Sequence, residues 1–183
     1  MNLSLTNKNA LVSGSTQGIG KAIAIELALL GANVTLLARD EGKLKNVAAA
    51  LDTSKGQKHN YLVADFTKPE ELRKKVEEFA KNNTAHILIN NTGGPAGGPI
   101  IEAKAEEFIQ TFSNHLLCNH ILVQALVPGM KKEKYGRIIN VISTSVKQPI
   151  KGLGVSNTIR AAVANWSKTL AAELGAFGIT VNN

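Results

Sequence analysis

The sequence is poor in cysteine, with Cys118 as its single example among 183 residues. One cysteine excludes an internal disulfide and is typical of proteins kept in a reducing cytoplasm. The chain also lacks a basic segment followed by an apolar core near its start, so we expect no signal peptide. Its apolar stretches are interrupted by charged residues and glycines well short of a membrane span, so we expect no transmembrane helix.

Aromatic residues are scarce, at 4% of the chain, although the net charge is +7. Nucleic-acid surfaces combine basic residues with aromatic side chains that stack on bases. The densest basic stretch, KKEKYGR at 131–137, is short and runs directly into an apolar segment. We therefore expect a solvated basic surface and no nucleic-acid partner, although a phosphorylated cofactor would also be attracted by positive charge.

Apolar segments rich in β-branched residues alternate with amphipathic segments along the chain. The first kind predicts strands at residues 10–13, 33–38, 60–64, 86–90, 137–142 and 179–182. The second kind predicts helices at residues 18–30, 41–51, 69–82, 105–130 and 156–174. This alternation is typical of the α/β class, with a doubly wound parallel sheet between two layers of helices in a single domain. Because the sixth strand falls at the end of the sequence, we expect the C-terminal part of the domain to be missing.

Local signals mark where these helices begin and end. Gly31 follows the first helix, whose apolar stripe is expected to face the core. The stretch TKPE at 67–70 indicates a capping box for the third helix, and Ser156 is suited to cap the last one. The stripe of the first helix consists of Ile19, Ile23, Leu27 and Leu30.

A glycine-rich stretch, SGSTQGIG at 13–20, joins the first predicted strand to the first helix. Gly14, Gly18 and Gly20 would let the backbone turn tightly and approach a ligand. The free N–H groups at the helix start would then favour a pyrophosphate. Such a turn can be purely structural, but its place in the first strand–helix unit favours dinucleotide binding.

The end of the second predicted strand, LLARD, carries both an arginine and an acid. In dinucleotide-binding folds an acid at this point accepts a hydrogen bond from the ribose 2′-OH, whereas an arginine accommodates a 2′-phosphate. Arg39 and Asp40 are both present, so these residues alone leave the choice between NAD and NADP open.

Together with Asp65 in VADF and the stretch NNTGG at 90–94, these features resemble the short-chain dehydrogenase/reductase family. The segments GRIINVIS at 136–143 and ELGAFGITVNN at 173–183 are similar to its fifth strand and to the run into its sixth. The likeness covers essentially the whole chain and includes members similar to beta-ketoacyl-acyl-carrier-protein reductase. It implies a Rossmann-like three-layer fold, and a homodimer or homotetramer joined through helices 105–130 and 156–174.

The resemblance also implies where a dinucleotide would bind. Asp65 would hydrogen-bond the adenine, and Asn90 would stabilise the central strands beside the cofactor. Ala38 stands where NAD-binding members have the ribose-reading acid, and Arg39 stands where NADP-preferring members have an arginine, so NADP(H) is favoured over NAD(H). Asp40 would then be a solvated residue at a helix start. The implied cofactor-binding residues are Gly14, Ser15, Thr16, Gly18, Ile19, Gly20, Arg39, Asp65, Asn91, Gly93 and Arg160.

Enzymes of this family use an asparagine, a serine, a tyrosine and a lysine in catalysis, and the sequence keeps one of the four. Ser143 matches the serine at the end of the fifth strand. Ser156 replaces the tyrosine and Arg160 replaces the lysine. The asparagine position falls on His115, with Asn114 beside it.

The chemistry of the replacements limits what they can do. A serine hydroxyl does not titrate near neutrality as a tuned tyrosine does, and Ser156 is too short to reach the same point. Arg160 stays protonated and cannot pass on a proton, although it could hold a ribose or phosphate. His115 suits proton transfer, but a lone histidine in an apolar helix is also commonly structural. Near it, Cys118 and His120 lack a third metal ligand or a paired base, so we expect neither a metal site nor a cysteine nucleophile.

Three functions remain compatible with the sequence. The first is an NADP(H)-dependent oxidoreductase for a small carbonyl or alcohol substrate, with the proton supplied by His115 or by a water held at Ser143. The second is a non-catalytic dinucleotide-binding sensor or regulator. The third, a scaffold that has lost its cofactor, is disfavoured by the glycine-rich turn and by Arg39.

Overall fold

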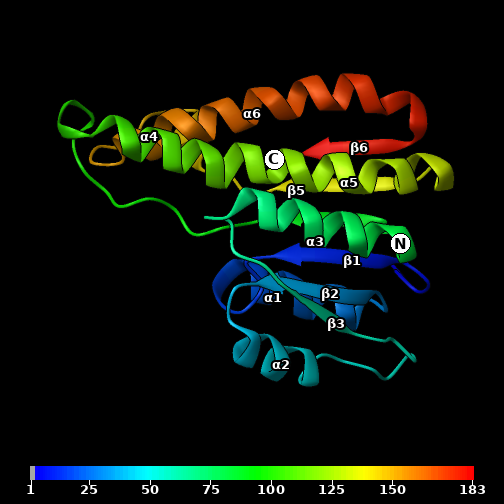
Figure 1. The fold of residues 1–183 in the computed structure, drawn as a ribbon. Coiled ribbons are helices and arrows are strands. Elements are labelled where there is room, and N and C mark those ends of the chain that lie inside the picture. The colour runs from blue at the N-terminus through cyan, green and yellow to red at the C-terminus, as the bar shows by residue number, and fades with distance from the viewer. Residues whose placement is uncertain (1–2) are drawn as a thin grey trace.

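The computed structural model describes residues 3–183 and contains a six-stranded parallel sheet in the order β3-β2-β1-β4-β5-β6 (Figure 1). The predicted doubly wound α/β fold is therefore confirmed, and the ends of its elements agree with the prediction or differ from it by one to three residues, apart from an interruption of the helix predicted at 105–130. The strands are β1 (Asn9–Ser13), β2 (Asn33–Ala38), β3 (Asn60–Val63), β4 (Ile87–Asn90), β5 (Gly136–Asn140) and β6 (Ile179–Asn182). The α-helices are α1 (Gly18–Leu29), α2 (Glu41–Ala49), α3 (Pro69–Asn82), α4 (Ala105–Phe112), α5 (Cys118–Glu133) and α6 (Gly154–Leu174).

The two faces of the sheet bury different helices. Ala10 and Val12 of β1 belong to the core layer formed with α1 and α2. Leu11, between them, belongs to the layer formed with α3, α5 and α6. Side chains alternate across a strand, so each apolar strand residue supplies one layer or the other. Within residues 3–183, every helix is too short or too polar to cross a bilayer.

Helix α1 packs on the sheet through small residues. Gly20, Ala24 and Ala28 are its buried positions, whereas Ile19 is 60% exposed. The prediction that Ile19 faces the core is therefore wrong, because the buried position of the first turn is Gly20, where a Cβ would collide with the Gly14 carbonyl oxygen. Gly31, with φ of 100°, follows the helix as predicted.

The helix predicted at 105–130 is divided into two by a π-helical turn. This turn, Ser113–Leu117, separates α4 from α5, and α5 continues to Glu133. An apolar pattern with a period of 3.6 does not reveal a locally widened turn, which explains the difference from the prediction. Such turns are frequent at functional sites, and this one contains His115.

Both predicted helix caps are wrong. The predicted capping box needs Thr67 at the N-cap of α3, but Lys68 occupies that position without a side-chain cap bond. The Thr67 N–H, from which Glu70 would accept in such a box, donates instead to Asp65 Oδ1 at 2.9 Å. Helix α6 begins at Gly154 rather than Ser156, because the chain before it is paired with another loop. The Gly98 N–H donates to the Gly152 carbonyl at 2.7 Å, and the Gly154 N–H donates to the Gly98 carbonyl at 3.3 Å.

This pairing joins the loop after β4 to the start of α6. Gly98 and Leu153 form an isolated parallel bridge, and a Cβ on Gly154 would lie 2.5 Å from Ile100 Cβ. Nearby, Asn157 Nδ2 donates to the Ile150 carbonyl at 2.9 Å. The two loops are therefore held together by backbone hydrogen bonds and by close packing that requires a glycine at position 154.

Candidate active site

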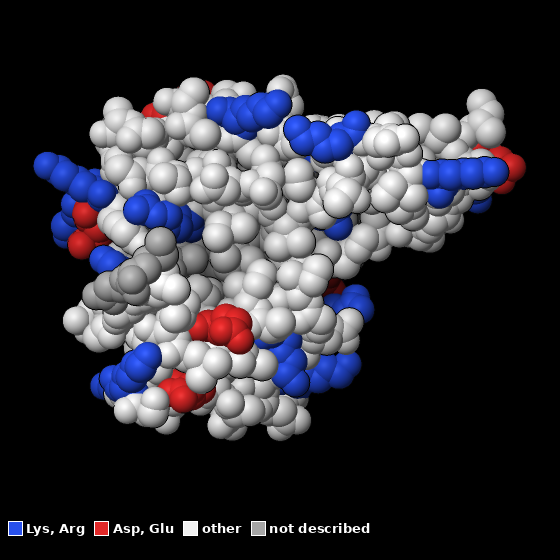
Figure 2. Space-filling model, turned by 180° about the vertical axis from the view of Figure 1, so that it is seen from behind, with Lys and Arg blue, Asp and Glu red and all other residues white. Residues whose placement is uncertain are grey.

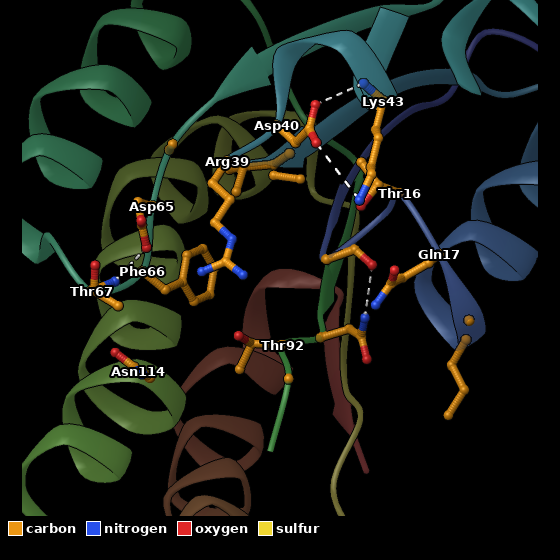
Figure 3. Close-up of a pocket in the computed structure, with 18 of the residues that line it drawn as sticks. Thr16, Gln17, Arg39, Asp40, Lys43, Asp65, Phe66, Thr67, Thr92 and Asn114 are labelled. Carbon is orange, nitrogen blue, oxygen red and sulfur yellow. Dashed lines mark hydrogen bonds and ion pairs between the residues drawn. The ribbon is translucent and has the colours of Figure 1, made fainter. Parts of the chain in front are cut away.

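A cavity of about 630 Å³ opens at the carboxyl edge of the sheet. The ends of β1, β2 and β3, the loop after β4 and the π-helical turn surround it (Figure 3). Ligands of open α/β sheets bind in this position. Figure 2 shows the molecule hollowed between its projecting end and its lower part, with basic side chains on the lower rim. The lining residues are Gly14, Thr16, Gln17, Gly18, Ile19, Leu37, Ala38, Arg39, Asp40, Lys43, Ala64, Asp65, Phe66, Thr67, Asn91, Thr92, Gly93, Gly94 and Asn114.

The glycine-rich turn has the geometry of a phosphate cradle. Gly14 has φ of +60°, and a Cβ there would lie 2.6 Å from the Asn91 carbonyl oxygen. A Cβ on Gly20 would collide with the Gly14 carbonyl oxygen. Gln17, at the N-cap of α1, makes no side-chain cap bond, so the first N–H groups of the helix remain available to a ligand. The residues present therefore fit a bound pyrophosphate.

Not every residue predicted at this turn faces the cavity. Thr16, Gly18 and Ile19 line it. Ser15 is fully buried, and its hydroxyl donates to the Leu37 carbonyl at 3.4 Å, so its side chain is turned away from the cavity. Gly20 is also buried, and it packs against the Gly14 carbonyl oxygen within the turn.

The loop after β4 is bonded directly to the glycine-rich turn. Ser13 Oγ accepts from the Asn91 N–H at 2.9 Å, and Asn91 Nδ2 donates to the Gly14 carbonyl at 3.2 Å. Below the loop, Asn90 Nδ2 donates to Asn140 Oδ1 at 2.7 Å, which joins β4 to β5. Asn90 thus links the central strands beside the cavity, as predicted.

At the end of β2, Arg39 lines the cavity and Asp40 caps the following helix. Asp40 is the N-cap of α2, where its Oδ1 accepts from the Lys43 N–H at 2.9 Å. Arg39 extends into the cavity on the side of Asp65 (Figure 3). The Thr67 N–H, with a smaller contribution from the Arg39 charge, lowers the pKa of Asp65. Asp40 is therefore a helix-start residue, as predicted.

Several lining residues were missed by reasoning from the sequence. Phe66, Thr67 and Thr92 follow strand ends, and that position was the available signal for them. Lys43 lies one helical turn after Asp40, and no motif marks it. Gln17 and Gly94 also line the cavity.

Two of the predicted catalytic residues, Ser143 and Arg160, lie near the end of β5. Ser143 caps a 3-10 turn (Thr144–Val146), and its Oγ accepts from the Ser145 N–H at 3.0 Å, which leaves its own proton available. Arg160 Nη1 donates to the Val141 carbonyl at 2.7 Å. Ser156 is half-buried one turn before Arg160 on α6.

His115 is buried within the π-helical turn, with 2% of its surface exposed. Burial, reinforced by the Arg160 charge, lowers its pKa to about 4, against an opposing hydrogen bond with the Gly93 backbone. The imidazole is therefore neutral at pH 7. This state makes His115 a poor source of a proton for a substrate and suits it to support the loop at Gly93.

The buried imidazole predicts a loss of stability in mild acid. Its folded pKa of about 4 lies below its unfolded value, so the contribution is complete above pH ~6.5 and is lost as the pH falls toward 4. The full shift corresponds to about 3 kcal/mol. Urea unfolding at pH 7 and pH ~4.5 should show a smaller pH-dependent loss in His115→Asn than in the wild type. Burial also lowers the pKa of His86, so the stability of the variant should still depend somewhat on pH. Equal losses of stability in the wild type and in His115→Asn would contradict the lowered pKa of His115.

The Cys118 thiol has no role in the cavity. It is fully buried and donates to the Phe66 carbonyl at 3.3 Å, and burial raises its pKa to about 12. His120 lies edge-on to Trp166, with ring centroids 6.1 Å apart. Across residues 3–183, no three His, Cys, Asp or Glu side chains cluster in a way that could hold a metal ion.

The family model described as short chain dehydrogenase matches residues 8–183. The chain belongs to the short-chain dehydrogenase family. L-sorbose reductase from Gluconobacter frateurii, solved in complex with NADPH and L-sorbose, superposes with a TM-score of 0.93 at 33% identity. That match covers 100% of this chain and 70% of the other.

Curated relatives in the short-chain dehydrogenase family include proteins named as active reductases and proteins named as inactive. The 3-oxoacyl-[acyl-carrier-protein] reductase FabG of Haemophilus influenzae is 35% identical over 97% of this chain and 72% of its own length. The human inactive hydroxysteroid dehydrogenase-like protein 1 is 31% identical over 95% of this chain and 53% of its own length. The chain thus spans about half the length of some curated relatives that it matches. The family resemblance expected from the sequence is confirmed.

Proposed function

We propose that the protein is a cytoplasmic NADP(H)-dependent oxidoreductase acting on a carbonyl or alcohol group of a small molecule. The observation that carries the proposal is the arrangement at the end of β2. Arg39 lines the cavity, and Asp40, which also lines it, accepts the cap hydrogen bond of α2 through Oδ1. An arginine that lines the cavity, next to an acid that caps a helix through one of its oxygens, favours a 2′-phosphate and therefore NADP(H). The NADPH complex of L-sorbose reductase supports the same choice.

Different residues along the cavity would bind different groups of the dinucleotide. The start of α1, with Gly14 and Gly18, would hold the pyrophosphate, and Arg39 would hold the 2′-phosphate. Asp65 would bind the adenine, and Asn91 and Gly93 would form the wall of the cavity next to the glycine-rich turn. Bound NADPH would supply the hydride for carbonyl reduction.

The proposed roles at the end of β5 follow from the hydrogen bonds of each group. Ser143 accepts from the Ser145 N–H, so its own hydroxyl proton can be donated to a substrate carbonyl oxygen. Arg160 remains charged and would hold the ribose next to the reacting carbon. Because His115 is neutral and buried, we assign the transferred proton to a water held at Ser143.

A second candidate is a dinucleotide-binding protein without turnover. It is favoured by Ser156 and Arg160 at positions where the family has a tyrosine and a lysine. Neither residue can supply the titrating acid that carbonyl reduction uses. NADPH binding without consumption of NADPH in the presence of carbonyl compounds would support this second function.

Calorimetry with NADPH and NADH tests the cofactor assignment. We expect the wild-type protein to bind NADPH roughly tenfold or more tightly than NADH, and Arg39→Gln to remove most of that difference. Arg73→Gln is a matched control, because Arg73 lies on α3 with Glu70 at 3.6 Å and is not a lining residue. Equal affinities in the wild-type protein would contradict the assignment to NADP(H).

We also propose a homodimer or homotetramer formed through the helices at 105–133 and 154–174. Ile109 and Phe112 of α4 support this assembly, because they are 69% and 44% exposed although both are large apolar side chains. Light scattering after size-exclusion chromatography measures the assembly directly.

A further inference from the structure

Lys43 occupies a position in α2 that helix energetics do not explain. It lies in the first turn, directly after Glu41 and Gly42. The positive end of the helix dipole disfavours a cation there and favours an acid. Its side chain nevertheless lines the cavity, at the same end as Arg39 (Figure 3).

Asp40 lies close to Lys43, but the two side chains form an ion pair without a hydrogen bond. The Asp40 Oδ2 atom lies 3.7 Å from Lys43 Nζ, beyond hydrogen-bond distance, and the two side chains are 46% and 62% exposed. An exposed ion pair of this kind contributes little free energy. The ammonium group therefore keeps its donors available to a stronger anion.

The other charges near this end of the cavity leave no closer partner for Lys43. Asp65 accepts from the Thr67 N–H at 2.9 Å, and this bond, with a smaller contribution from the Arg39 charge, lowers its pKa. Glu41 pairs with Lys45, whose Nζ lies 2.9 Å from Glu41 Oε1. Two cations, Arg39 and Lys43, thus line one end of the cavity.

We infer that Lys43 is a second phosphate-binding residue, which together with Arg39 grips the 2′-phosphate of NADP(H). A phosphate monoester carries about −1.5 to −2 charges at neutral pH, which matches two cations better than one. Arg39 can bind it through paired N–H donors, and Lys43 adds a compact charge on a flexible stem. The inference rests on the proposed NADP(H) function and names a residue that sets its cofactor specificity.

Calorimetric titration of the purified protein with NADPH and with NADH tests the role of Lys43. Lys43→Gln is expected to raise the dissociation constant for NADPH roughly five- to tenfold and to leave that for NADH unchanged. Because a charge contact with phosphate is lost, NADPH binding by the variant should also depend less steeply on salt concentration. Lys45→Gln is the matched control, since Lys45 lies on the same helix, is paired with Glu41 and is not a lining residue.

The possible results separate this inference from the proposed function. A variant with wild-type NADPH affinity, or one that weakens NADPH and NADH equally, would overturn the role of Lys43 while NADPH binding itself stands. A loss of NADPH affinity in Lys45→Gln equal to that in Lys43→Gln would also overturn it. If the wild-type protein binds neither dinucleotide, the proposed function and the inference both fail.

Discussion

Gly20→Ala is expected to weaken NADPH binding by roughly 100-fold or more. The added Cβ would collide with the Gly14 carbonyl oxygen and would lie 2.6 Å from Asn91 Nδ2. The first of these atoms belongs to the backbone, so the turn must move. A displaced turn would misdirect the N–H groups at the start of α1 that the pyrophosphate requires. Calorimetry measures the loss, and thermal unfolding shows whether the fold persists.

Gly175→Ala is the matched control for this substitution. Gly175 follows α6 with φ of −56°, and a Cβ there would meet no atom within 4 Å. The control should bind NADPH as the wild-type protein does. Wild-type affinity in a folded Gly20→Ala protein would show that the glycine-rich turn does not hold the cofactor.

The double substitution Ser156→Tyr with Arg160→Lys is expected to raise kcat/KM for NADPH-dependent carbonyl reduction by ~10²–10⁴-fold. The introduced tyrosine would provide the titrating acid, and the introduced lysine one turn later would lower its pKa. Ser156 is half-buried in the first turns of α6, one turn before Arg160. The decrease in NADPH absorbance with a panel of ketones and ketoses, including L-sorbose, measures the rate.

Arg160→Lys alone separates the two contributions to that gain. This single variant lacks the acid, so its rate should remain close to that of the wild-type protein. The double variant must also bind NADPH normally for the comparison to hold. No increase in a double variant that binds NADPH would show that these two positions do not limit turnover.

The fold could be predicted because its elements depend on local patterns. The β-branched segments and amphipathic helices lie where periodicity places them, and Gly31 ends α1 as its position suggests. The errors arise where tertiary contacts determine the residue at which a helix begins. Ser156 does not cap α6 because the Gly98–Leu153 bridge fixes the chain just before Gly154. Thr67 does not cap α3 because it lies one residue before the N-cap, Lys68, and its N–H is bonded to Asp65.

The site was predictable only in part, because some of its properties depend on burial. The glycine-rich turn and Arg39 follow from spacing along the chain. The protonation state of His115 does not, because it depends on its enclosure in a π-helical turn near Arg160. Lys43 was missed because its place in the cavity follows from the direction in which α2 leaves the sheet.

The pairing of Gly98 with the segment before α6 couples the positions of two parts of the chain that are distant in sequence. The loop after β4 and the first turn of α6 share the hydrogen bonds of Gly98 and the close packing of Gly154 on Ile100. A displacement of one is transmitted to the other. The position of Ser156 is therefore set jointly by its own helix and by a loop more than fifty residues upstream. Substitutions in 97–100 would thus displace the start of α6, which carries Ser156, without touching any residue assigned to chemistry.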